Sequence, residues 1–220
     1  MLMESKMSHM DNSRRKLIVE NAAFFIFRLL SGVIVTVLFI ILAFIIIKGI
    51  NVVNWDFLTT YPTDGMKAGG IYPAIVGTFC LMAGSAVFAF PLGIMSGIYM
   101  HEYASNGRLI KFIRMMTNNL SGIPSIVFGL FGMSLFVNYL GFGDSIIAGS
   151  LTLGLLALPL VIRTTEEALK AIPDSYREGS LALGATKLQT IRKVILPMAM
   201  PNIITGLILA LGRVSGETAP

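Results

Sequence analysis

The sequence predicts an all-α integral membrane protein, for two reasons. Hydrophobic residues make up 55% of the 220 residues and charged residues only 13%, with a mean hydropathy of +0.77, whereas a soluble domain has about 25% charged residues. The charged residues also leave five uncharged stretches that are long enough to cross a bilayer as helices. These stretches are 29–47, 68–100, 115–143, 145–162 and 194–212.

The first predicted element is a membrane anchor. Residues 1–23 are a mostly polar tail, and residues 24–50 contain the first uncharged stretch, between Arg28 and Lys48. This apolar part is too long for a signal peptide, and no small-x-small cleavage site follows it. We therefore expect a retained transmembrane helix.

The other four stretches contain residues that bend helices or let them pack closely. Each includes at least one proline: Pro91, Pro124, Pro159 and Pro201 lie in successive stretches. Proline removes a helical hydrogen bond, which membrane helices tolerate where neighbours or a water-filled cavity satisfy the backbone. Glycines spaced by four, Gly93 with Gly97 and Gly212 with Gly216, allow helices to approach closely. The pattern is typical of a bundle whose helices bend.

The distribution of Lys and Arg predicts which segments are cytoplasmic. Five of these residues precede the first stretch, three lie within 101–114 and six within 163–193, whereas the turn 141–144 has none. Because cytoplasmic loops are enriched in Lys and Arg, the N-terminus and the segments 101–114 and 163–193 are expected in the cytoplasm.

The cytoplasmic segment 163–197 is too long and too patterned to be a simple connection. Asp174 and Ser175 are suitable for capping a helix start, and Gly184 is suitable for ending that helix. A second helix is expected from Thr186. Such a pair of short helices can enter a groove of a partner protein or lie on lipid headgroups, and the pattern alone favours neither.

One spacing in this segment resembles the EAA motif of permease subunits in binding-protein-dependent ABC importers. The motif is Glu-Ala-Ala, three residues, Gly, nine residues, Ile-x-Leu-Pro. Here Glu178, Gly184 and the final Leu-Pro pair keep that spacing, while residues of similar size replace the two Ala, and Val194 replaces Ile. The resemblance implies that residues 175–197 dock on a separate ATP-binding subunit. The residues expected at this contact are Glu178, Gly179, Ser180, Ala182, Gly184, Ala185, Leu196 and Pro197.

Four longer segments look like PstA-type permeases of phosphate importers. They are "GGIYPAIVGT" (69–78), "SGIPSIVFGLFG" (121–132), "LGATKLQTIRKVILP" (183–197) and "ALGRVSGETAP" (210–220). The resemblance covers the chain from about residue 65 to its end. It implies a MetI-like bundle in the bacterial plasma (inner) membrane, with five of an expected six spans present. Residues 68–220 would form the permease core, truncated before the sixth span.

The resemblance also implies partner subunits. These are a second, PstC-like permease, cytoplasmic ATP-binding subunits and an extracytoplasmic phosphate-binding protein. This chain has no P-loop, because the G-x4-G-K-[ST] pattern and any Gly-Lys dipeptide are absent from it. We therefore expect a non-catalytic subunit with no cofactor of its own, and ATP bound by its partner.

A phosphate ion that crosses a membrane needs donors to replace its water, and arginine offers them in a planar fork. Arg213 is the only Lys or Arg within or beyond the fifth stretch, and Glu217 follows four residues later, on the same side of a helix. We expect Glu217 to neutralise Arg213 until phosphate competes for it. Thr218, Ser121 and Ser125 are further candidates for the substrate path. The alternative is a structural salt bridge at the outer interface, where Arg213 can reach water.

Other functions stay open at this stage. The same fold could transport another anion, such as sulfate or molybdate, because the external binding protein sets most of the selectivity in such systems. A secondary transporter or channel is a different class, against which the long patterned loop argues. No paired carboxylates, nucleophile or metal-ligand set indicates an enzyme or a metal site, and no strong basic cluster indicates nucleic-acid binding.

Overall fold

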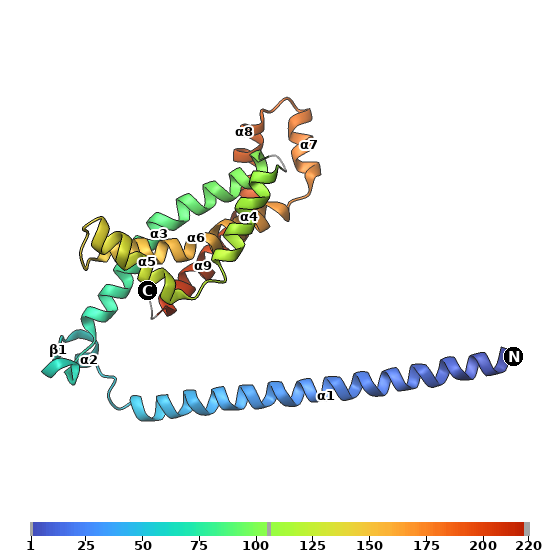
Figure 1. Ribbon diagram of the computed structural model, residues 1–220, viewed down its shortest axis with the longest axis horizontal. Coiled ribbons are helices and arrows are strands. Elements are labelled where there is room, and N and C mark those ends of the chain that lie inside the picture. Colours follow the sequence, from blue (N-terminus) through green and yellow to red (C-terminus); the bar gives the residue numbers. More distant parts are fainter. Residues whose placement is uncertain (1, 105–106, 218–220) are drawn as a thin grey trace. The chain divides into compact units, whose positions relative to one another are not determined.

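The computed structural model describes residues 2–104 and 107–217, most of them helical (Figure 1). The chain divides into two units, Met1–Tyr72 and Pro73–Pro220. Within the described part, four helices are long and apolar enough to cross a membrane, and a bent pair of helices raises the number to five if it counts as one span. The predicted fold class, a bundle with about five membrane spans, is confirmed.

The first unit contains the anchor helix and a small hairpin. α1 (Leu2–Gly49) is one helix, and its segment Glu20–Gly49 is apolar enough to cross a membrane. The helix continues through residues 23 and 24, where the polar tail was predicted to meet the anchor. Tail and anchor therefore differ in composition but belong to the same helix. After it come α2 (Trp55–Thr59), β1 (Pro62–Thr63), the 3-10 turn η1 (Asp64–Met66) and β2 (Ala68–Gly69), the two strands pairing antiparallel.

Three long helical segments of the second unit correspond to expected spans. They are α3 (Tyr72–Ile98) with the π-helical turn η2 (Tyr99–Tyr103), α6 (Ile146–Lys170), and a continuous run of α8 (Lys187–Thr190), the π-helical η4 (Ile191–Ile195) and α9 (Leu196–Gly216). The second span begins at Tyr72 rather than at residue 68, because Ala68 and Gly69 belong to the hairpin. α6 and α9 continue past the predicted ends at 162 and 212, because a charged residue ends an apolar stretch without ending a helix.

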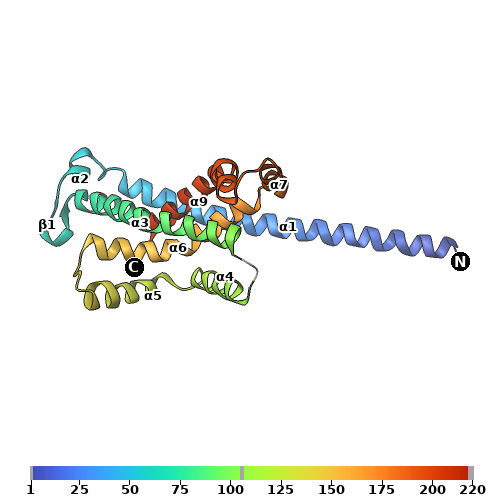
Figure 2. The ribbon, with the colours of Figure 1, turned by 90° about the horizontal axis from the view of Figure 1, so that it is seen from above.

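α6 lies between α3 and α5 (Ser125–Gly132) in the second unit (Figure 2). Four small residues of α3, spaced by four, are buried: Ser85, Ala89, Gly93 and Gly97. A Cβ atom on Gly93 would lie 2.6 Å from Val161 Cγ1. One on Gly97 would lie 2.7 Å from Thr165 Cβ. The close approach predicted for the first glycine pair is therefore confirmed, and the rising numbers on both helices show that α3 and α6 are parallel.

The second glycine pair has a different environment. A Cβ atom on Gly212 or Gly216 would meet nothing within 4 Å in the described part of this chain. The predicted close approach of another helix is therefore not seen at this face of α9.

α9 packs antiparallel against α6. Near one end, Leu169 of α6 shares a buried cluster with Ile195 and Ala199. Towards the other end, Ala157 of α6 packs with Val214. Along the contact, residue numbers fall on α6 as they rise on α9, so the two helices run in opposite directions. These directions agree with the predicted alternation of spans two, four and five.

The predicted third span, 115–143, is wrong in its first part. α4 (Arg108–Leu120) is a separate helix, and the segment Ile110–Leu120 makes an angle of 101° with the segment Ser125–Tyr139, which consists of α5 and the π-helical η3 (Met133–Tyr139). Two causes explain the bend. Pro124 lacks an N–H and disfavours a helical conformation in the residue before it, and α4 carries Arg, Lys and Asn side chains typical of a helix at a membrane surface.

The segment after α6 forms two short helices, as predicted. α7 (Asp174–Ala182) ends before Gly184, whose φ of +82° lies in the left-handed region that glycine favours. α8 starts after its N-cap Thr186, whose side chain and that of Gln189 form a capping box. The predicted cap at Asp174 and Ser175 is wrong: Pro173 occupies the capping position, and no side chain caps this start.

Candidate functional site

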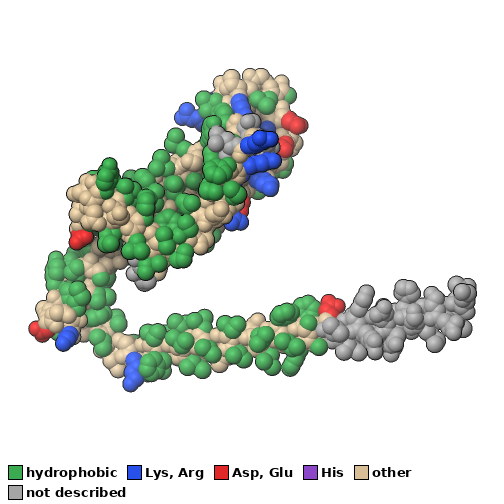
Figure 3. All heavy atoms as spheres, viewed as in Figure 1, with side chains coloured by type: hydrophobic (Ala, Val, Ile, Leu, Met, Phe, Trp, Pro, Cys, Tyr) green, Lys and Arg blue, Asp and Glu red, His purple; other side chains and the backbone are tan. Residues whose placement is uncertain are grey.

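The candidate coupling segment lies at one end of the second unit. α7 and α8 extend beyond the end of α6, close to η2 and one end of α4 (Figure 1). On the face shown in the space-filling view, hydrophobic side chains are spread along the bundle, whereas Lys and Arg gather at the end with α7 and α8 (Figure 3). A charged end on an apolar body is what a membrane bundle presents to water.

The turn between α7 and α8 displays apolar side chains to solvent. Leu181, Leu183 and Leu188 are 49%, 90% and 64% exposed, and we name these three residues the apolar knob. Leu181 and Leu183 lie between the fourth and fifth spans, and Leu188 lies at the very start of the helical run that contains the fifth span. Exposed apolar groups of this kind mark a contact surface for another protein or for a membrane.

The EAA-type residues divide into two groups. Glu178, Gly179, Ala182 and Gly184 are exposed on α7 and its turn, while Ser180 and Ala185 are half-buried. Ser180 Oγ lies 2.9 Å from Thr190 Oγ1, which links α7 to α8. Leu196 and Pro197 lie apart from the turn, at the start of α9, where Leu196 packs on the core. The structure thus brings six of the eight predicted residues together and gives Leu196 a packing role.

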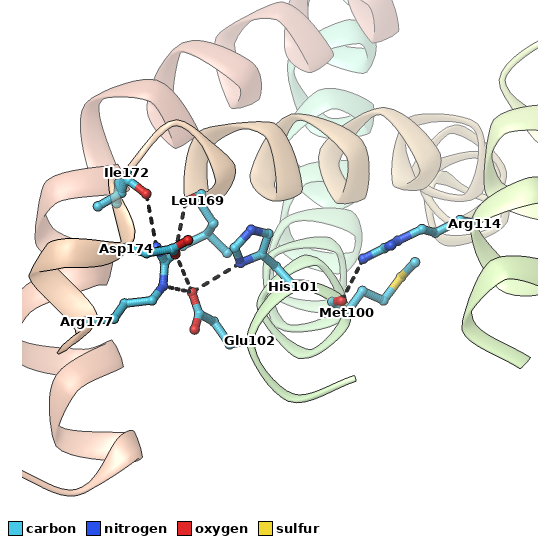
Figure 4. Close-up of polar contacts among 8 residues, drawn as sticks. All are labelled: Met100, His101, Glu102, Arg114, Leu169, Ile172, Asp174 and Arg177. Carbon is cyan, nitrogen blue, oxygen red and sulfur yellow. Dashed lines mark hydrogen bonds and ion pairs between the residues drawn. The ribbon is translucent and has the colours of Figure 1, made fainter. Parts of the chain in front are cut away.

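Arg177 connects this segment to the ends of two spans (Figure 4). Its Nη2 donates to Glu102 Oε1 of η2 at 2.8 Å and to the carbonyl oxygen of Leu169 at 3.0 Å. Its Nη1 donates to the carbonyl oxygen of Ile172 and to Asp174 Oδ1, both at 3.0 Å. The Glu102 side chain is only 6% exposed, and that of Arg177 15%.

A second arginine joins α4 to the same ends. Arg114 Nη2 donates to the carbonyl oxygen of Met100 at 2.9 Å, and its Nε donates to Glu166 Oε1 at 3.1 Å. These side chains, with Arg163 and Lys170, line an open polar groove of about 700 Å³ between α4 and α6. Two arginines therefore hold η2, α4, α6 and α7 together at this end.

The sequence interpretation missed both arginines and their acidic partners. A weak signal was present, because Glu102 lies two residues after the 68–100 stretch. An acidic residue that becomes buried at the end of a span needs a partner. Nothing in the spacing identified Arg177 as its partner, since 75 residues separate the two.

The second candidate site is the pair Arg213–Glu217. Arg213 lies in the last turn of α9, and Glu217 is the first residue after the helix, with extended backbone angles. Arg213 Nε donates to Glu217 Oε1 at 3.4 Å, and the two side chains are 34% and 16% exposed. The expected i, i+4 pair is thus formed, and both side chains remain partly accessible.

The other predicted path residues do not join this pair. Ser121 and Ser125 lie on either side of the bend between α4 and α5, and Ser121 Oγ donates to the carbonyl oxygen of Thr117. Neither forms a hydrogen bond with Arg213 or Glu217 within the described residues. Thr218 lies outside the described residues.

Comparison with known proteins identifies the family. Residues 89–220 match the model of the binding-protein-dependent transport system inner membrane component. The chain belongs to this family of permeases. The bundle, the exposed segment after α6 and the family match agree with one another, and they describe a multi-pass membrane protein.

Individual relatives confirm the expected resemblance to PstA-type permeases. The chain is 46% identical over 153 residues to "Phosphate transport system permease protein PstA 1" of Mycobacterium tuberculosis, covering 70% of this chain and 50% of that one. It is 39% identical over 202 residues to "Probable ABC transporter permease protein YqgI" of Bacillus subtilis, covering 92% and 69%. This permease thus spans about half the length of the mycobacterial PstA relatives that it matches.

Solved structures support the same architecture. An inward-facing form of the MetNI methionine ABC transporter is 26% identical, with a TM-score of 0.56 over 67% of this permease and 68% of that chain. The expected MetI-like helix bundle is therefore confirmed.

Proposed function

We propose that this permease is a membrane subunit of an ATP-driven phosphate importer. The apolar knob is the observation that carries the proposal. It is exposed around the turn between α7 and α8, on a segment with EAA spacing, so it offers a partner an apolar contact that the bonds of Arg177 hold in place. The ATPase is then a separate cytoplasmic subunit that binds ATP, and this chain needs no cofactor of its own.

Phosphate is the proposed cargo for two reasons. Relatives at 35–46% identity are named as phosphate transport permeases. In addition, Arg213 and Glu217 are partly accessible, so that an anion could replace the Glu217 carboxylate at Arg213. Arginine suits an oxyanion because its planar donors can bind two oxygens at once.

The proposed assembly has further subunits. A PstC-like permease would pair with this one, and an extracytoplasmic phosphate-binding protein would deliver the anion. The N-terminus and the apolar knob would face the cytoplasm, in keeping with the Lys and Arg content of these segments.

An uptake assay tests the proposal. The permease, a PstC-like permease and the ATPase subunits are reconstituted in vesicles with the binding protein added outside, and uptake of radiolabelled phosphate is followed with and without ATP enclosed in the vesicles. We expect ATP-dependent uptake that excess unlabelled phosphate abolishes and that sulfate or molybdate leaves intact. Uptake competed by sulfate or molybdate instead would assign another anion. Uptake without ATP or an ATPase subunit would favour a secondary transporter.

A further inference from the structure

We propose that Arg177 and Glu102 form the connection through which movement of the coupling segment reaches the second and fourth spans. This inference rests on the proposed function. Arg177 acts here as a positioning residue, because it contacts neither the cargo nor ATP. The connection consists of Arg177, Glu102 and the carbonyl oxygens of Leu169 and Ile172, and we name it the Arg177 cluster.

The first argument is that α7 has no buried residues. A helix usually stays in place because an apolar face packs against the core, and α7 has no such face turned inward. Only residues 171–173 join it to the end of α6. Ile172 in this link packs into the core, and beyond it side-chain bonds hold α7, most of them supplied by Arg177.

The second argument is that Arg177 contacts both spans at once. Leu169 lies in the last turn of α6, where carbonyl oxygens have no i+4 helical partner, and its carbonyl oxygen accepts from the Ile172 N–H at 3.3 Å. Arg177 donates to this carbonyl at 3.0 Å while the same Nη2 atom donates to Glu102 at 2.8 Å. A displacement of α7 therefore acts on the end of α6 and on η2 together.

The third argument is burial. Glu102 is 6% exposed, so removal of Arg177 would leave a buried carboxylate without its cation, a loss that side-chain relaxation repairs poorly. Asp174 bonds to the same guanidinium but is 85% exposed, and such pairs contribute little. Glu102 is thus the partner that fixes Arg177, and Asp174 provides a matched control.

Two neighbouring contacts define how far the connection extends. His101 Nδ1 lies 3.2 Å from the same Glu102 oxygen, within η2 itself. Lys187 Nζ lies 5.0 Å from the centre of the Tyr103 ring, so α8 also contacts the end of η2. The first contact lies within η2 and the second joins η2 to α8, whereas the Arg177 cluster joins α7 to both η2 and α6.

The test measures transported phosphate per ATP hydrolysed in the reconstituted complex. For Arg177→Met and Glu102→Gln we expect the ATPase subunits to co-purify at wild-type amounts, because the apolar knob is unchanged. ATP hydrolysis should continue while phosphate moved per ATP falls by about tenfold or more. Asp174→Asn should stay within about twofold of wild type. Arg177→Lys should be intermediate, because one ammonium cannot replace the planar fork.

A cross-linking experiment covers variants that assemble poorly. Cys80 is replaced by serine, Glu102 and Arg177 by cysteine, and a short reducible bifunctional thiol reagent joins the two positions. We expect low phosphate per ATP before joining, a recovery of at least about threefold after it, and loss again on reduction. The recovery would be absent if Arg177 served only folding.

The outcomes separate the two proposals. Wild-type phosphate per ATP in Glu102→Gln and Arg177→Met would overturn the connection, and so would loss of the ATPase subunits from both variants. A wild-type complex that imports no phosphate would contradict the proposed function, and the same ratio would then be measured with the anion that does support ATP-dependent uptake.

Discussion

Arg213 and Glu217 meet across the end of α9, with Nε of Arg213 3.4 Å from Oε1 of Glu217. The arginine belongs to the last helical turn and the glutamate to the extended residue that follows it. The carboxylate can therefore rotate away without unwinding any helix. The proposed phosphate path needs a fixed cation whose carboxylate partner the anion can replace, and the first two predictions test whether Arg213 and Glu217 act in this way.

Replacing Arg213 with alanine should abolish most phosphate uptake. The change removes the donors that would bind the anion, and hydrogen bonds to charged groups contribute about 1.5–3 kcal/mol each. We expect uptake at low phosphate to fall by about 10- to 100-fold, since 1.4 kcal/mol corresponds to tenfold. The ATPase subunits should still co-purify. Undiminished uptake would instead identify the pair as a structural salt bridge.

Replacing Glu217 with glutamine should have the opposite effect on binding. The competing negative charge disappears, so phosphate should bind Arg213 more tightly and leave more slowly. We expect the phosphate concentration for half-maximal uptake to fall together with the maximal rate, both measured in the vesicle assay. A higher half-maximal concentration would show that Glu217 helps to bind the anion rather than to release it.

Replacing Leu183 with aspartate should detach the ATPase subunits. Leu183 is 90% exposed, so the change costs the permease itself little stability, but it places a charge in an apolar contact. We expect co-purified ATPase to fall by about tenfold, as for a central interface residue. Val52→Asp alters an apolar residue that is 56% exposed in the first unit and serves as the control. Equal loss in both variants would contradict the assignment of the knob.

Replacing Gly97 with valine should destabilise the bundle. A Cβ atom there would lie 2.7 Å from Thr165 Cβ and 2.9 Å from the carbonyl oxygen of Ile162, so the helices must separate. Overpacking of this kind typically costs about 1–3 kcal/mol, and the thermal midpoint of the permease in detergent should fall. Gly212→Val meets open space among the residues that the structure describes and should leave the midpoint unchanged. Similar midpoints for the two variants would contradict the packing of α3 on α6.

The sequence predicted much of the fold because the spans leave a strong signal. Uncharged stretches located α1, α3, α6 and α9, and Gly184 and Thr186 located the turn between α7 and α8. The prediction that residues 115–143 form one span was wrong because Asn118 and Asn119 are uncharged and yet too polar for lipid. A count of charges therefore could not separate α4 from α5. The ends of α6 and α9 were also predicted too early, since a membrane helix can continue beyond the lipid into water.

The candidate site was only partly predictable. Glu178 and its neighbours stand in a recognisable spacing, and Arg213 and Glu217 are close in sequence, so both groups could be found. The pair of Glu102 and Arg177 depends on how the ends of α3 and α6 meet, which no local pattern encodes. Pairs that depend on tertiary packing need a structure to reveal them.

The close packing of α3 on α6 restricts how this permease can move. Because Gly93 and Gly97 leave no free space beside Val161 and Thr165, the two helices cannot slide or separate without steric clash or loss of contact. We therefore expect α3 and α6 to move as one unit. The opening and closing of a path would then take place where packing is looser, at the glycine face of α9 or against a neighbouring subunit.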